Sequence, residues 1–377
     1  MPSTPLVAAA VATAVLIGLL STLLDSIRSA LARRFSLADG GPDLGRGVSV
    51  GSLLLMPLAG ALVDLWGVHA VLFSGSLLLA FGVAWFGVAK SMQTLRFGVV
   101  GIAFGGAGVT LAGLRVMPLA FRFGPSPTDA GAFCVGFVFV AVAALLTLYL
   151  YPSLVSRVGY RNTLLFTALA CLAPAAIASF VEPNVFPQGR PEPTLAAPLG
   201  DGRFWLLALL IFFWFPIEHS LDVWPRPFLS ELGYSGKSVT SLLVGFWTCF
   251  LLLRLGMAWA FQQGADIWLA FFLALIPPMV LGNLVGAYAA SSGYFGFWIV
   301  GACYGPLLPA FLGFATHLFP GQTVVLGLLL SIDAFCALLI RPWFIRYLQG
   351  HTARASMRIP LVFGLLLSAA ILVLALL

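Results

Sequence analysis

Charged residues are scarce in this sequence. Only 8% of its 377 residues are Asp, Glu, Lys or Arg, whereas 61% are hydrophobic and the mean hydropathy is +1.05. A water-soluble domain needs roughly a quarter of its residues charged to cover its surface. The composition therefore excludes a soluble protein and predicts an integral membrane protein whose surface mostly faces lipid.

Paired cysteines and clustered histidines are also lacking. The five cysteines lie singly in apolar stretches, without C-x-x-C or Cys/His spacing, and the four histidines are scattered. This pattern predicts no disulfide framework, no metal site and no cofactor. Without an H-E-x-x-H sequence or a Ser–His pair at helical spacing, the chain is not expected to be an enzyme. The net charge of +6 comes without basic residues interleaved with aromatics, so we expect no nucleic-acid partner.

Long apolar stretches are abundant instead. A helix needs about 20 apolar residues to span a bilayer, and the chain offers about twelve such stretches. We predict spans at residues 6–34, 46–66, 68–89, 96–121, 129–155, 160–181, 203–230, 237–262, 265–290, 293–318, 322–348 and 358–377. They leave no room for a soluble domain, so the function must reside inside an all-α bundle.

A polar segment with five prolines divides the chain nearly in half. Proline at this density cannot continue a helix, so we predict an extended connector at 182–202 between six-helix bundles at 1–181 and 203–377. Short stretches recur in the same order in both halves: 49–54 resembles 238–243, and 100–105 resembles 300–305. Tandem six-helix repeats place a solute site near the midplane between the halves, where rocking alternates access.

One loop carries a recognisable motif. Gly60, Asp64 and Gly67 form the pattern G-x-x-x-D-x-x-G after the second span. With this motif and the repeat, the chain resembles the major facilitator superfamily over essentially its whole length. The resemblance implies two pseudo-symmetric six-helix bundles and secondary transport by alternating access. The glycines allow a tight turn and close helix approach, and the aspartate can meet a helix N-terminus or an arginine.

The chain departs from the family pattern at two places. Around the second glycine of the loop motif the family usually carries arginine or lysine, and here only His69 is present. The fifth span lacks the Gly-Pro-x-x-Gly-Gly pattern of drug:proton antiporters, which disfavours drug efflux.

Ionisable side chains within spans are functional candidates, because each costs several kcal/mol at membrane depth unless it is paired or wetted. The seventh span places Glu218 and Asp222 four residues apart on one face, with His219 beside them. The first span offers Asp25 and Arg28 at a spacing of three. Two interpretations stay open for both groups: proton coupling or substrate binding, and salt bridges near the helix ends.

Other candidates are dispersed along the chain. Asp333 lies midway along the eleventh span without a sequence-near partner, and it joins the coupling candidates. The substrate-cavity candidates are Arg115, Arg254, His317, Trp247, Trp298 and Tyr304. Each has a structural alternative: Arg115 could pair with Asp64, Arg254 could hold its helix in place, and the aromatics could belong to the core or the membrane interface.

The sequence thus predicts a secondary active transporter of a small polar metabolite, sugar-like or an organic anion, with proton coupling. The alternatives are a multidrug-type carrier and a non-transporting receptor or assembly protein on the same scaffold. We expect a monomer in the cell (inner or plasma) membrane, with solute, proton and lipid as partners. The resemblance places both termini in the cytoplasm, whereas the distribution of Lys and Arg among the loops favours the opposite orientation.

Overall fold

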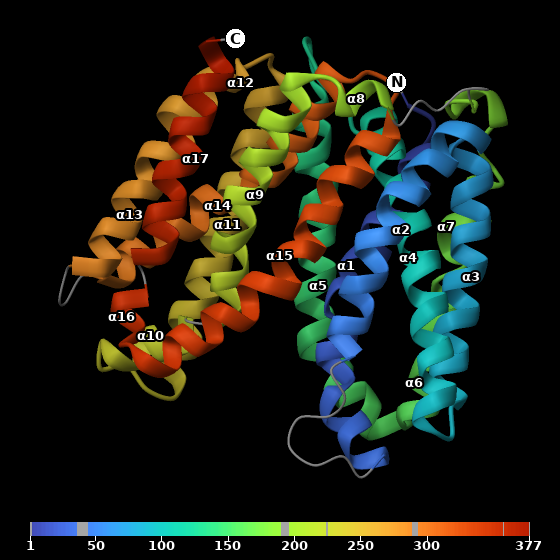
Figure 1. Ribbon diagram of the computed structural model, residues 1–377. Helices are drawn as coiled ribbons and strands as arrows, with labels where there is room; N and C mark the ends of the chain where they lie inside the picture. The colour runs from blue at the N-terminus through green and yellow to red at the C-terminus, as the bar shows by residue number, and fades with distance from the viewer. Residues whose placement is uncertain are drawn as a thin grey trace. The chain divides into compact units, whose positions relative to one another are not determined.

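The computed structural model describes residues 2–35, 44–189, 196–223, 225–288, 293–356 and 358–376 (Figure 1). All regular elements in these ranges are helical. The long helices are α1 (Thr4–Arg34), α2 (Leu44–Trp66), α3 (Val68–Val88), α4 (Met92–Ala120), α5 (Asp129–Val158), α6 (Tyr160–Ala170), α9 (Gly202–Val223), α11 (Lys237–Gln262), α13 (Ile276–Tyr288), α14 (Gly293–Leu318), α15 (Thr323–Gly350) and α17 (Arg358–Leu376). The short ones are α7 (Ala173–Ala178), η1 (Pro183–Val185), α8 (Ala196–Leu199), α10 (Pro225–Glu231), α12 (Ile267–Leu269), η2 (Ala270–Leu275) and α16 (Ala353–Ser356).

The predicted spans agree with the observed helices. Among the described residues, 10 helices are long and apolar enough to cross a membrane, and each coincides with a predicted span. The other two predicted spans fall on α9 with α10, and on the run of α12, η2 and α13. This all-α polytopic architecture confirms the predicted fold class.

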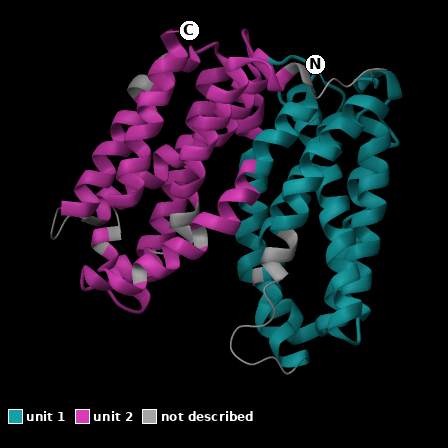
Figure 2. Cartoon of the chain, viewed as in Figure 1, with its two compact units in different colours: residues 1–121, 136–195, 319–331 teal, residues 122–135, 196–318, 332–377 magenta. Residues whose placement is uncertain are grey.

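The described chain forms two compact units (Figure 2). Unit 1 comprises residues 1–121, 136–195 and 319–331, and unit 2 comprises residues 122–135, 196–318 and 332–377. Two helices are therefore divided. The start of α15 belongs to unit 1, and the start of α5 belongs to unit 2.

Glycines bring the main helix pairs of each unit together. In unit 1, a Cβ on Gly105 of α4 would lie 2.3 Å from the Leu79 backbone nitrogen on α3. In unit 2, a Cβ on Gly296 of α14 would lie 2.4 Å from the Gly282 carbonyl oxygen on α13. Small residues of this kind drive helix packing in membranes, because lipid provides no hydrophobic force between helices.

The proline-rich connector differs from its prediction. Instead of a fully extended segment, it contains η1 and α8 at its two ends, while residues 190–195 lie outside the described ones. Pro183 starts η1, where its missing N–H costs no hydrogen bond. Pro216 lies inside α9, which continues to Val223, and Pro225 starts α10.

Candidate functional site

The loop motif forms the turn between α2 and α3 in unit 1. Asp64 lies in the last turn of α2, and Gly67 follows with a φ of 84°, a conformation that only glycine adopts readily. Val68 then starts α3. The tight turn leaves the Asp64 carboxylate at the end of the helix pair.

The Asp64 carboxylate caps the start of α15. Its two oxygens accept hydrogen bonds from the backbone nitrogens of Thr323, at 2.8 Å, and Val324, at 2.9 Å. These are the first two residues of α15, whose N–H groups have no partner within the helix. A carboxylate there satisfies the donors and complements the positive end of the helix dipole. Of the two partners expected for Asp64, the structure shows the helix N-terminus.

Two glycines allow α2 and α15 to approach this closely. A Cβ on Gly60 would lie 2.7 Å from the Thr323 carbonyl oxygen, and one on Gly327 would lie 2.4 Å from the Met56 carbonyl oxygen. Both obstacles are backbone atoms, so a side chain at either position would force the helices apart.

A glycine substitution tests this approach. We expect Gly327→Ala to destabilise the protein by about 1–3 kcal/mol, because the methyl group overpacks a backbone contact. Gly350→Ala on the same helix is the matched control, since nothing lies within 4 Å of its Cβ. Thermal unfolding in detergent should show a lower melting temperature for Gly327→Ala only, and equal melting temperatures would contradict the packing.

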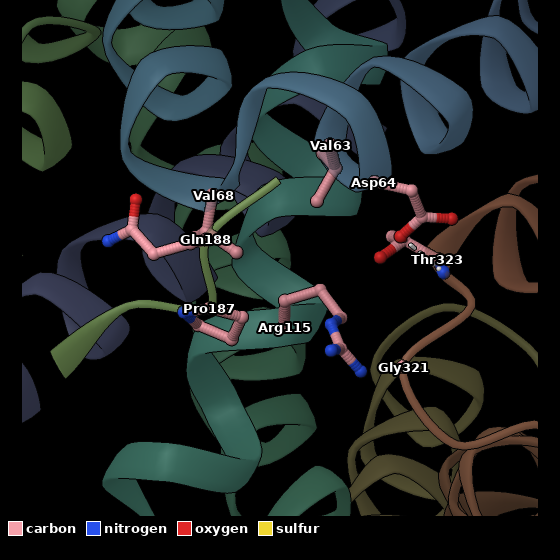
Figure 3. Close-up of a pocket in the computed structure, with 8 residues that line it drawn as sticks. All are labelled: Val63, Asp64, Val68, Arg115, Pro187, Gln188, Gly321 and Thr323. Atoms are coloured by element: carbon pink, nitrogen blue, oxygen red, sulfur yellow. Dashed lines mark hydrogen bonds between the residues drawn. The ribbon is translucent and has the colours of Figure 1, made fainter. Parts of the chain in front are cut away.

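A cavity of about 260 Å³ lies beside the capped helix start (Figure 3). Asp64 and Val63 of α2 line it together with Val68, Arg115, Pro187, Gln188, Gly321 and Thr323. The Arg115 side chain reaches from α4 toward the segment of Gly321 and Thr323. One cation, one carboxylate and part of the connector therefore meet at one cavity.

Unit 2 contains an analogous contact between the end of α11 and the segment leading into α5. The Gln262 side-chain oxygen accepts a hydrogen bond from the Phe123 backbone nitrogen at 2.8 Å. At the start of α5, Asp129 accepts hydrogen bonds from Arg122 and, at 3.0 Å, from the Thr316 hydroxyl. The Gln262 contact thus resembles the Asp64 contact in joining a helix end to a distant backbone N–H, but it lies before α5 and does not cap its start.

A second polar group is buried in unit 2. Arg254 of α11 is 5% exposed, donates from Nε to the Gly305 carbonyl of α14, and stacks 4.3 Å from the Phe250 ring centroid. Glu218 of α9 is half-buried and interacts electrostatically with Arg254 and with Tyr304, which is 1% exposed. Arg254 thus bonds to the residue that follows Tyr304, and Glu218 lies within electrostatic range of both side chains.

The remaining aromatic candidates share one hydrophobic core, to which His317 does not belong. Trp298 donates its indole N–H to the Leu242 carbonyl at 2.9 Å, and Trp298 and Trp247 pack against the hydrophobic core of unit 2. His317 is exposed at the end of α14. These contacts match the structural alternatives for the two tryptophans.

The other charged candidates are described only in part. Arg28 is exposed and Asp333 is half-buried. The side chains of Asp25, His219 and Asp222 lie outside the described ones.

Sequence reasoning missed several residues of the Asp64 site. The Thr323 and Val324 amides belong to the backbone, and no sequence pattern marks them as partners of Asp64. Pro187 and Gln188 were visible only as part of a proline-rich connector. Two signals pointed to this site: the motif Gly-x-x-x-Asp and the possible pairing of Arg115 with Asp64.

Three solved structures of transport proteins have a fold similar to that of this chain. The fucose:proton symporter of E. coli superposes with a TM-score of 0.78 at 15% sequence identity, covering 98% of this chain and 98% of that chain. The human organic anion transporter TETRAN gives 0.70 at 16% identity, with 99% and 100% covered. A bacterial homologue of the iron transporter ferroportin gives 0.75 at 13% identity, with 99% of each chain covered. No family model and no curated protein matches the sequence.

These likenesses establish the class and then the fold. The chain is an integral membrane protein made of helices. It has the fold of major facilitator superfamily transporters over nearly its full length, as the loop motif and the repeat predicted.

Proposed function

We propose that this protein is a secondary active transporter of a small polar metabolite that works by alternating access. The observation that carries the proposal is the cap of Asp64 on Thr323 and Val324, which binds α2 to the start of α15 within unit 1 through hydrogen bonds at a helix end. Such a contact can break and reform without unfolding either helix. A carrier needs a contact of this kind at one stage of its cycle.

The buried group in unit 2 supports proton coupling. Arg254 is held by the Gly305 carbonyl and the Phe250 ring and lies within electrostatic range of Glu218, and the proposal takes it as the countercharge of that acid. An acid at membrane depth is a functional candidate. Beside a cation and a tyrosine, it can take up and release a proton or accept a hydrogen bond from a substrate hydroxyl. The similar fold of a fucose:proton symporter agrees with this role. The proposal keeps the inner or plasma membrane and a monomer as expectations from the sequence.

Proton flux tests the proposal. Proteoliposomes with an internal pH dye would be challenged with pooled sugars, carboxylates, amino acids and nucleosides. We expect one pool to move protons in the wild type. Glu218→Gln should abolish that flux, because the glutamine amide cannot take up and release a proton near neutral pH. Asp201→Asn is the matched control, since Asp201 is an acid paired locally with Arg203 at the surface. Loss of flux in both variants, or in neither, would remove Glu218 as the coupling acid.

Silence of the wild type against every pool would leave the two alternatives, a carrier of larger compounds or a non-transporting scaffold. Solute exchange without proton movement would identify a uniporter. Either result would contradict the proton-coupled reading.

A further inference from the structure

Part of the connector packs on the loop motif. Residues 183–189, here called the strap, lie in unit 1 together with the turn between α2 and α3. Phe186 is only 2% exposed, and its ring centroid lies 5.7 Å from that of His69 on α3. Burial of a phenylalanine side chain contributes about 1.5–3 kcal/mol, so this ring anchors the strap.

The strap also engages the backbone on both sides of the turn. The Pro187 carbonyl accepts a hydrogen bond at 3.3 Å from the backbone nitrogen of Val68, the first residue of α3. That N–H would otherwise lack a partner, as at every helix start. On the other side, a Cβ on Gly189 would lie 2.0 Å from the Leu65 carbonyl oxygen in the last turn of α2. Glycine is thus required where the strap touches α2.

These contacts flank Asp64. Leu65 follows it directly, and Pro187 and Gln188 line the same cavity as Asp64 and Thr323 (Figure 3). Around the second glycine of the motif this chain has His69 but neither arginine nor lysine. The structure shows another set of contacts at that turn, made by the strap.

We propose that the strap is a positioning element for Asp64. It holds the end of α2 and the start of α3 in the geometry that directs the carboxylate to the Thr323 and Val324 amides. The connector thereby controls how firmly the start of α15 is bound. The consequence for transport rests on the proposed function, whereas the structural coupling does not.

Hydrogen exchange in lipid nanodiscs tests the coupling. Gly189→Ala prevents the strap from seating against Leu65, and Phe186→Ala removes the anchor without a clash. Gly202→Ala is the matched control, because nothing lies within 4 Å of its Cβ. Asp64→Asn is the comparison variant that weakens the cap and leaves the strap contacts in place.

We expect both strap variants to speed amide exchange at 64–71 and, remotely, at 321–326, by about tenfold, because the closed population of each segment falls. Asp64→Asn should speed exchange at 321–326 and leave 183–189 unchanged. If Gly189→Ala fails to fold, Phe186→Ala decides alone. Faster exchange at 183–189 with wild-type exchange at 321–326 would overturn the inference.

The outcome is distinct from that of the transport proposal. Coupled exchange in a protein that moves no solute would uphold the strap and reject the transporter. Solute flux in a protein whose segments 183–189 and 321–326 exchange independently would uphold the transporter and reject the strap.

Discussion

Asp64→Asn is expected to lower solute flux by about 10- to 100-fold while leaving the helices folded. The carboxylate accepts two backbone hydrogen bonds at the start of α15, at 2.8 and 2.9 Å. Hydrogen bonds to a charged group contribute about 1.5–3 kcal/mol each, and asparagine keeps one neutral oxygen acceptor. If the conformation with the Asp64 cap is destabilised by about 1.5–3 kcal/mol, its equilibrium with the other conformations of the transport cycle shifts by one to two powers of ten.

Initial rates of solute uptake in proteoliposomes provide the measurement. Asp266→Asn is the matched control, because Asp266 also caps backbone, accepting a hydrogen bond from the Trp268 nitrogen at 2.7 Å, but lies in the loop after α11 and not at the start of α15. The helical content of both variants, measured by circular dichroism, should equal that of the wild type. Wild-type flux in Asp64→Asn would show that the cap has no role in the cycle.

The second large effect concerns stability. Arg254→Leu should destabilise the protein by about 3–5 kcal/mol, because removing one member of a buried charged group leaves its partner uncompensated. The substitution removes three interactions at once: the hydrogen bond to the Gly305 carbonyl, the stacking on Phe250 and the electrostatic interaction with Glu218. Thermal unfolding in detergent should show a clear drop in melting temperature, whereas Arg226→Leu, at an exposed position on α10, should not.

A double-mutant cycle separates the charge effect from the packing effect. Glu218→Gln in the Arg254→Leu background should recover part of the lost stability, because no uncompensated carboxylate remains. Strictly additive losses would mean that Glu218 and Arg254 do not compensate each other. Glu218 would then lose its place as the acid with a fixed countercharge.

The sequence predicted those features that depend on local pattern. Apolar runs long enough to span a bilayer predicted the membrane helices, because in lipid a continuously apolar run can satisfy its backbone hydrogen bonds only as a helix. The glycines and aspartate of the loop motif indicated a tight turn with a carboxylate that meets a helix end. The apolar runs and the loop motif can each be recognised from residues that are neighbours in the sequence.

Contacts between residues far apart in the sequence could not be predicted. The bond from Asp64 to Thr323 joins residues 259 positions apart, and its donor is a backbone amide that every residue possesses. Gln262 and Phe123 are 139 positions apart and form the analogous contact without a shared motif. The strap was hidden for another reason: prolines exclude a long helix but do not show what the segment packs against.

The most direct test of the account is solute counterflow. Proteoliposomes loaded with each unlabelled pool would be diluted into buffer containing traces of its labelled members, without any ion gradient. A carrier that alternates access should accumulate one labelled solute transiently above equilibrium, and the Asp64→Asn variant should do so at least about tenfold more slowly. Failure of every pool to show an overshoot in the folded wild-type protein would contradict the central claim that this chain is a transporter of small polar metabolites.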